Sequence, residues 1–192
     1  MVQTSMGVRP KVQTLRIVYL AEGFELRARV RFPPSHDDNI NSDGEMILGF
    51  RMAQHHTQQF LFQVLRTLDL AHLSYLEIDG FAEGISLWPV FDSLPELGEV
   101  RVDLRPQSIV DHLWYESRVE VAQDASTAIP FPALRTLDLR NSMTPIHLKR
   151  LEQALAVRSH FPIPLRKLII CGSAVPEDIR GALQSVVQEL IL

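Results

Sequence analysis

Two stretches of this chain align without a gap at an offset of 31 residues. LRTLDLRNSMTPIHLKRLEQAL begins at Leu134, and LRKLIICGSAVPEDIRGALQSV begins at Leu165. Identical or similar residues recur at matched positions: Leu134 and Leu165, Arg135 and Arg166, Leu137 and Leu168, Leu139 and Ile170, Ser142 and Ser173, Pro145 and Pro176, Leu148 and Ile179. Self-similarity at one period is the mark of repeat architectures, in which each unit packs against its neighbours.

Each repeat is predicted to form one strand followed by one helix. The last two leucines of Leu-x-x-Leu-x-Leu lie on one face of a short strand, because side chains alternate with a period of two. Thr144 is a candidate N-cap, Pro145 suits the first helical turn, and apolar residues recur at helical spacing as far as Leu155. In the second repeat Val175 is a poor cap, and Ser173 is the alternative. Such a unit cannot bury its apolar face alone, so we expect stacked units.

The same motif recurs more loosely along the rest of the chain. Further matches begin at Val12, Leu65, Leu73, Leu97 and Val187. The matches at 65–70 and 73–78 are too close for two full repeats, so one of them is a turn or an extra strand. A helix is expected over Ser108–Val119 and a polar loop over Ala122–Pro130. These motifs account for many of the 26 leucines of the chain.

The N-terminal third is less regular. Apolar residues from Phe24 to Phe32 alternate with polar ones that include Arg27, Arg29 and Arg31, which predicts a half-buried strand with a basic outer face. Residues 33–44 are expected to form a polar loop. A helix is expected over Glu45–Val64, and its apolar side would consist of Met46, Phe50, Ala53, Phe60 and Leu61. We predict one α/β domain over residues 1–192, a leucine-rich-repeat, solenoid-like array with an irregular part at 1–64 and repeats at 65–192.

Composition and targeting signals limit the classes of protein. The chain is 46% apolar and 22% charged, which is ordinary for a soluble globular protein, and its net charge of −4 gives no basic excess for nucleic acid. Cys171 is the single cysteine, so neither an intrachain disulfide nor a cysteine-built zinc site is expected. There is no signal-peptide pattern, and no apolar run approaches the roughly 20 residues that cross a bilayer. We expect a cytoplasmic or nuclear protein that has no membrane partner.

The residues that could carry chemistry form no catalytic pattern. His55 and His56 are adjacent, so on a helix they point about 100° apart and cannot share a metal ion. His36-Asp37-Asp38 lies in the predicted polar loop, and Gly84-Ile85-Ser86-Leu87-Trp88 lacks the second glycine of a nucleophile elbow. Cys171 has no catalytic-thiol signature and is expected to be structural, and Trp88 and Trp114 are expected in the core. We therefore predict no enzyme, no cofactor, and no catalytic or metal-binding residues.

The C-terminal repeats resemble those of a known family. FPALRTLDLRN, a predicted helix, and then PLRKLIICGSAVPEDIRGALQSVV are similar to the C-terminal repeats of F-box-type leucine-rich-repeat proteins, which are abundant in mushroom-forming fungi. The resemblance covers 131–192 well and 60–104 loosely. In that family an F-box binds the Skp1 adaptor, and the repeats present substrates to a cullin-based ubiquitin ligase. The resemblance implies a substrate-recognition role.

The chain departs from that family in three ways. Ser142 and Ser173 replace the consensus Asn or Cys after the strand, and no F-box is evident. Ser93-Leu94-Pro95-Glu96-Leu97 echoes an F-box opening, but a strand-like segment follows it, so we interpret it as part of a repeat. The chain also ends in a strand-like segment at Leu192 without a polar capping repeat, which leaves a fragment or a short gene model open.

A repeat array also predicts a binding surface, because residues between the buried leucines of the strands point to the concave face. By this rule the partner-binding residues are Tyr75, Glu77, Glu99, Arg101, Asp103, Thr136, Asp138, Arg140, Lys167 and Ile169. The mixture of charges with an aromatic and an aliphatic residue suits a protein partner better than phosphate. Asp138→Arg is expected to weaken partner binding and to leave thermal stability nearly unchanged. A Skp1-like adaptor would bind only if an F-box lies outside this chain, and the alternative is a stand-alone structural or scaffolding repeat protein.

Overall fold

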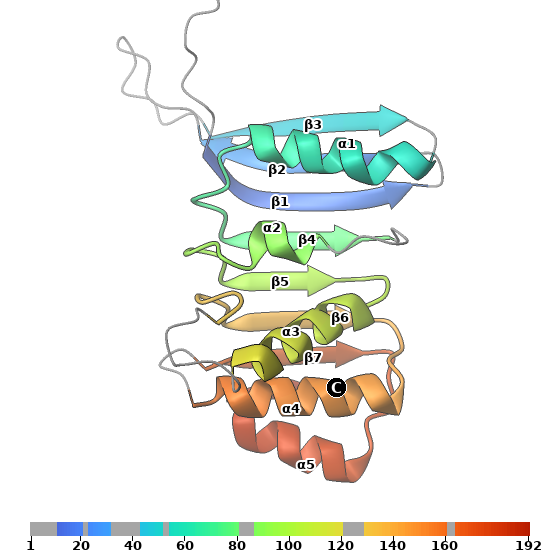
Figure 1. Ribbon diagram of the computed structural model, residues 1–192, viewed down its shortest axis with the longest axis vertical. Coiled ribbons are helices and arrows are strands. Elements are labelled where there is room, and N and C mark those ends of the chain that lie inside the picture. Colours follow the sequence, from blue (N-terminus) through green and yellow to red (C-terminus); the bar gives the residue numbers. More distant parts are fainter. Residues whose placement is uncertain are drawn as a thin grey trace, which may run out of the picture.

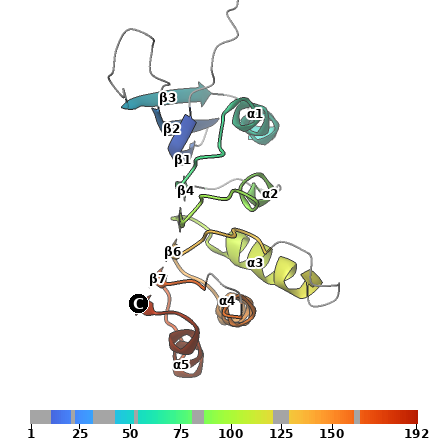
Figure 2. The same ribbon diagram turned by 90° about the vertical axis from the view of Figure 1, so that its left-hand side faces the viewer.

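A computed structural model describes residues 11–20, 23–31, 43–51, 54–80, 87–120, 129–160 and 164–192. In these residues eight strands form a single open sheet with the order β3-β2-β1-β4-β5-β6-β7-β8. All five helices of the described residues lie on one face of this sheet (Figures 1 and 2). The predicted α/β class is confirmed, and the sheet is mixed, with parallel and antiparallel pairs.

The larger part of the sheet is parallel. Its strands are β1 (Lys11–Leu20), β4 (Tyr75–Asp79), β5 (Glu99–Val102), β6 (Thr136–Arg140), β7 (Lys167–Cys171) and β8 (Glu189–Ile191). The register brings the middle apolar residues of successive motifs into one row, which runs through Leu15, Leu76, Val100, Leu137, Leu168 and Leu190. All of these except the partly buried Leu190 are fully buried, so the leucine motif marks the helix-facing side of the sheet.

One backbone arrangement recurs before each of the last four strands. The carbonyl of Ser74 accepts hydrogen bonds from two consecutive N–H groups, those of residues 98 and 99, at 3.1 Å each. The carbonyls of Gly98, Arg135 and Arg166 accept in the same way from residues 135–136, 166–167 and 188–189. Units of unequal length are thus joined by the same hydrogen bonds, although only two of them align closely in sequence.

Helices cover the buried side of the sheet. They are α1 (Gln54–Thr67), α2 (Trp88–Phe91), α3 (Gln107–Glu120), α4 (Pro145–Arg158) and α5 (Glu177–Val186). Helix α4 buries Leu148, Leu151 and Leu155 against the strands, and α5 buries Ile179 and Leu183. The predicted strand–helix pairs after residues 134 and 165 and the predicted helix at 108–119 are confirmed.

The helix starts differ in part from the prediction. Thr144 occupies the N-cap position of α4 and Pro145 opens the helix, but the Thr144 hydroxyl bonds the His147 ring at 2.7 Å and caps no backbone N–H. Ser173 does not cap α5, which begins after Pro176. The Ser173 hydroxyl instead accepts the N–H of Met143 at 2.8 Å, and so ties together the turns after β6 and β7.

An antiparallel hairpin extends the parallel sheet at its N-terminal side. Strand β2 (Gly23–Arg31) pairs antiparallel with β1 and with β3 (Asp43–Arg51). Strand β2 buries Leu26, Ala28 and Val30, while the three arginines between and after them are exposed, so the predicted strand with a basic outer face is confirmed. Residues 32–42, which hold most of the predicted 33–44 loop, and residues 121–128 of the second predicted loop lie outside the described residues.

The predicted helix over Glu45–Val64 is correct from residue 54 onwards and wrong for residues 45–51. Residues as far as Arg51 form β3, and the helix α1 begins only at Gln54. Met46, Leu48 and Phe50 alternate with exposed residues and pack against the core, which is the period of a strand. The Phe50 ring lies 5.1 Å from that of Phe24 on β2 and 5.0 Å from that of Phe60 on α1.

Two ambiguous segments are settled by the structure. The 65–70 match forms the end of α1 and the turn after it, whereas 73–78 leads into and through β4, so the first is the turn. Leu97 is buried and lies two residues before β5, so the segment from Ser93 to Leu97 leads into a strand, which agrees with its interpretation as part of a repeat. Trp88 is buried as predicted, whereas Trp114 is only partly buried and donates to Gln153 at 2.9 Å.

Candidate functional site

The face of the sheet opposite the helices is the candidate site, and we call it the outer face. No helix of the described ranges covers it, and the sheet bends so that this face lies on the inside of the curve (Figure 2). Its side chains come from strand positions between the buried leucines. The register arranges them in three rows across the parallel strands.

The structure places all ten sequence-predicted residues on this face or at its rim. The first row holds Thr14, Tyr75, Glu99, Thr136, Lys167 and Glu189. The second row holds Arg16, Glu77, Arg101, Asp138, Ile169 and Ile191. The third contains Asp79 and Arg140 in strands, with Asp103 directly after β5. Their shared placement is observed, and their role in binding a partner stays a prediction.

The second row is a ladder of alternating charge. Arg16 Nε lies 3.4 Å from Glu77 Oε1, and Arg101 Nε lies 3.7 Å from the same oxygen. Arg101 Nε also lies 4.0 Å from Asp138 Oδ2. One positive or negative side chain therefore stands on each of four adjacent strands, and each contacts the oppositely charged neighbour across the strand pair, an arrangement that stabilises a sheet.

The third row closes the ladder into a network. Arg16 Nη2 donates to Asp79 at 3.1 Å, and Arg101 Nη2 donates to Asp103 at 3.1 Å. Arg140 donates to Asp138 from Nε and Nη2, at 3.1 to 3.3 Å, and its Nε lies 3.7 Å from Asp103. Three arginines and four carboxylates thus pair with one another and leave one excess negative charge in the network. The hydrogen bond to Asp138, and then the charge of that carboxylate, raise the pKa of the Arg140 guanidinium.

Two members of the network are buried although they lie on the outer face. Glu77 is 8% exposed and Asp138 is 5% exposed, because the long arginine side chains lie over them. This burial argues against the expectation that Asp138→Arg leaves thermal stability nearly unchanged, and we predict a loss of stability instead. A carboxylate in this position holds guanidinium groups in place, and an arginine there would confront two others.

Tyr75 connects the first row to the network. Its hydroxyl donates to Glu77 Oε2 at 3.0 Å. The pKa of Tyr75 is raised to about 12, mainly by partial burial and secondly by the negative charge of Glu77 and the hydrogen bond to it. The phenol is therefore neutral at physiological pH and orients one carboxylate of the ladder.

The rest of the first row is accessible to a partner. Glu99 is exposed and Thr136 is half-buried, and Lys167 pairs with Glu189 at 3.0 Å in an exposed bridge. Exposed bridges of this kind contribute about 0–1 kcal/mol, so they rearrange readily. Within the described ranges, Glu99 and Thr136 of the first row are not held in ion pairs as the members of the network are.

Sequence reasoning missed Arg16 and Asp79 as members of the network. The signal for Arg16 was present, because Val12-x-x-Leu15-Arg16-Ile17 puts it at the motif position that Glu77 occupies in β4. Asp79 follows Ile78 as Asp103 follows Val102, so the same alignment of motifs would have found it.

A second missed feature is a pair of adjoining depressions where the hairpin meets the parallel strands. Their volumes are about 310 Å³ and 490 Å³, and both are lined by Thr14 and Arg29. We call the two together the basic hollow, because they are also lined by four further cationic side chains: Lys11, Arg16, Arg27 and Arg31. The alternation that predicts a basic face on β2 was the available signal.

The described residues contain no group of three or more histidine, cysteine or acidic side chains that could hold a metal ion. Cys171 is a partly exposed free thiol at the end of β7. His55 and His56 lie in α1, but their side chains are outside the described part, as are His36-Asp37-Asp38 and residues 84–86.

Comparisons with known proteins do not assign the chain to a family. No protein-family model, curated protein or solved structure matches the chain. Among the helices that the structure describes, none combines the length and the apolar character that crossing a membrane requires.

Proposed function

We propose that this chain is a protein–protein interaction module whose outer face binds its partner, and that its parallel strands form a solenoid-like array of leucine-rich-repeat units. The observation that carries the binding role is the outer face itself, an ordered polar surface of three rows that no described helix covers. The shared carbonyl arrangement before β5, β6, β7 and β8 supports the repeat interpretation, because the same backbone contact joins each successive unit.

The chemistry of the outer face favours a protein as the partner. The accessible residues combine an aromatic ring, a carboxylate, an ammonium group and aliphatic side chains, from Tyr75, Glu99, Lys167 and Ile169. Interfaces between proteins have this mixed character, with aromatic anchors and polar rims. The network beside these residues keeps the backbone and the neighbouring side chains in fixed positions, which lowers the entropy lost on binding.

We propose further that the module is similar to the substrate-recognition repeats of F-box subunits of cullin-RING ubiquitin ligases. This proposal rests on the sequence resemblance of residues 131–192. The alternative is a stand-alone scaffolding repeat protein. Co-purification with Skp1 separates the two: an upstream-extended chain that encodes an F-box should bind Skp1 stoichiometrically, and an extended chain that does not bind would leave the scaffolding role.

The binding role is tested with a random peptide display library selected on the immobilised protein. The Glu99→Lys, Thr136→Lys double variant changes the first row at positions that make no described ion pair. Glu177→Lys on α5 is the matched control, because that side chain is exposed on the helix side. We expect enriched peptides that lose binding to the double variant and keep it for the control. Enriched peptides that bind both equally, or a library without enrichment, would contradict the proposal.

A further inference from the structure

The basic hollow lies on the outer face of β1, β2 and β4, and its wall includes Tyr75 and Glu77, two of the ten residues that the sequence identifies. It differs from the charge network because its positive charge is incompletely compensated. Glu77 in its wall is committed to two arginines, and Glu96 is bonded to His72 at 3.1 Å. Glu25, beside it on β2, is paired with Arg27.

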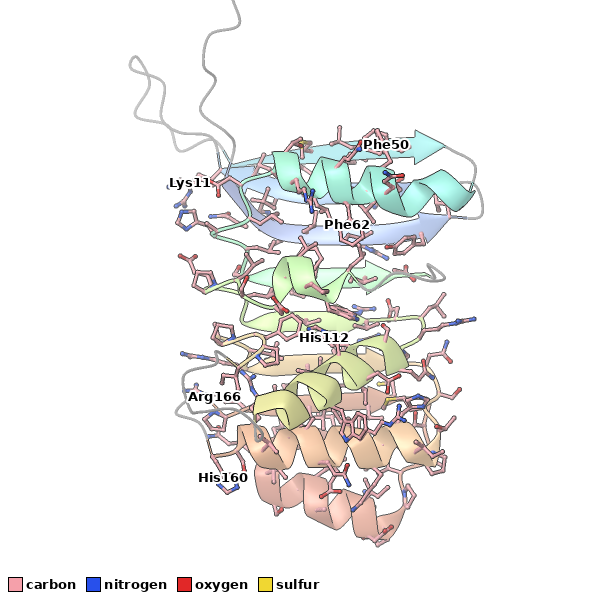
Figure 3. All side chains as sticks on the ribbon, in the orientation of Figure 1. Lys11, Phe50, Phe62, His112, His160 and Arg166 are labelled. Carbon is pink, nitrogen blue, oxygen red and sulfur yellow. The ribbon has the colours of Figure 1, made fainter. Side chains whose placement is uncertain are left out.

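Two cations of the hollow have no ion pair anywhere in the described ranges. Arg29 lies in the register between Thr14 on β1 and Glu45 on β3, and it lines both depressions. Lys11 pairs in register with Arg31 and lines the larger depression, and its side chain projects at the start of β1 (Figure 3). Both are exposed, so they are available to an incoming anion at little desolvation cost.

The spacing of the arginines on β2 indicates the shape of that anion. Arg27, Arg29 and Arg31 occupy alternate positions of one strand, so their Cα atoms are roughly 6.8 Å apart along it. An extended peptide repeats its own side chains on one side at nearly the same interval. In the register Lys11 lies opposite Arg31, so Lys11 and Arg29 are offset along the strand pair by that same interval. Carboxylates at alternate positions of such a peptide would meet the ammonium group of Lys11 and the guanidinium of Arg29, which binds a carboxylate through two parallel hydrogen bonds.

We propose that the basic hollow binds an acidic peptide segment in extended conformation, with carboxylates at alternate positions. The inference rests on the proposed function, because it assigns the chemistry of the partner to one part of the same face. Nucleic acid fits less well: Glu45, Glu77 and Glu96 line the hollow, and the whole chain carries a net charge of −4. A polyphosphate of uniform charge would meet these carboxylates, whereas a peptide can present separate ones.

The test measures fluorescence anisotropy with a labelled peptide Glu-Ser-Glu-Ser-Glu-Ser-Glu and its all-glutamine counterpart, at low and at physiological salt. The protein variant is Arg29→Gln with Lys11→Gln. The matched control is Arg135→Gln with Arg166→Gln, which removes two exposed arginines that precede β6 and β7. Arg166 is labelled in Figure 3. Both double variants lower the net charge equally, so a nonspecific charge effect would weaken both. Thermal unfolding of each variant confirms that the fold is intact.

We expect the acidic peptide to bind and the glutamine peptide not to bind. The Arg29→Gln, Lys11→Gln variant should lose at least roughly tenfold in affinity, because two charge-assisted contacts are removed. The control should change less than about twofold. Equal losses in both double variants, or equal binding of both peptides, would overturn the inference. Tighter binding of a single-stranded oligonucleotide at the same residues would show that the ligand is a nucleic acid and that the peptide inference is wrong. If library peptides require the first row but are not acidic, the proposed function stands and this inference alone is wrong.

Discussion

Replacing Asp138 distinguishes a structural network from a freely accessible binding surface. Its carboxylate accepts three hydrogen bonds from Arg140 and lies within 4.0 Å of Arg101, and only 5% of the residue is exposed. Removing one partner of a fully buried ion pair costs about 3–5 kcal/mol. Here the Arg140 side chain is 43% exposed and can regain water, so the cost falls to about 2 kcal/mol.

For Asp138→Ala this loss of unfolding free energy lowers the melting temperature by about 4–8 °C, since a domain of this size loses roughly 2–4 °C per kcal/mol. Asp138→Asn keeps the shape and should lose about half as much. Asp138→Arg adds repulsion with Arg101 and Arg140, so it should lower the melting temperature the most of the three.

Differential scanning calorimetry measures these shifts, and Glu99→Arg is the matched control. Glu99 lies on the neighbouring strand of the same face but is exposed and makes no ion pair in the described residues, so its replacement should stay within about 0.5 kcal/mol. A melting temperature of Asp138→Arg within about 1 °C of the wild type would refute the reasoning. It would show that the charges of the ladder are solvated and interchangeable.

Three further predictions concern single positions. Arg158 is buried and donates to three main-chain carbonyls in the segment before β6, at 2.7 to 3.1 Å. Arg158→Met should therefore lower the free energy of unfolding, measured by urea titration, by about 3–5 kcal/mol. A loss below about 1 kcal/mol would show that water replaces the guanidinium. The pKa of Tyr75 is raised to about 12 from its ordinary value of 10.0, so the folded state favours the neutral phenol. The stability that this preference contributes is complete below pH 10 and is lost as the pH rises towards 12. In an ultraviolet titration of tyrosine ionisation, the absorbance step near pH 12 should be absent in Tyr75→Phe. A step at pH 10 in the wild type that this variant removes would contradict the hydrogen bond to Glu77. Gly80 has a φ of +97°, and an added Cβ would lie 2.7 Å from the Tyr19 carbonyl oxygen. Gly80→Ala should therefore lower the free energy of unfolding, measured by calorimetry, by more than about 1 kcal/mol. An unchanged melting temperature would exclude this close approach.

The repeat pattern predicted the parallel strands well because one physical requirement sets both the sequence and the structure. A strand that is covered on one side only must place apolar residues at alternate positions, and Leu137 and Leu139 do so in register with Leu168 and Ile170. The helix after each strand is predicted for the same reason, since its apolar stripe must cover those leucines.

The segment from Glu45 to Phe50 was mispredicted because its apolar residues fit two periods. Met46, Phe50 and Ala53 are spaced as on a helix, whereas Met46, Leu48 and Phe50 alternate as on a strand. The choice is made by pairing with β2, whose unpaired edge accepts a third strand, and by the aromatic contacts of Phe50 with Phe24 and Phe60. Strand preference depends on such neighbours more than helix preference does, so local sequence could not decide it.

The residues of the outer face were predictable one strand at a time, but their ion pairs were not. Glu77, Arg101 and Asp138 belong to units separated by loops of different length, and only the register of the folded sheet places them side by side. The burial of Asp138 has the same origin, because it depends on which neighbouring side chain is an arginine long enough to cover it.

The network changes which part of the outer face can supply binding energy under the proposed function. A partner that contacted Glu77 or Asp138 would have to displace arginines that already satisfy these carboxylates, and it would gain only the difference between two sets of ion pairs. Glu99 in the first row and Arg29 and Lys11 in the basic hollow carry no such competing bond in the described part of the chain. Substitutions in the network should therefore appear mainly as changes in stability, and substitutions in the first row and the hollow mainly as changes in affinity.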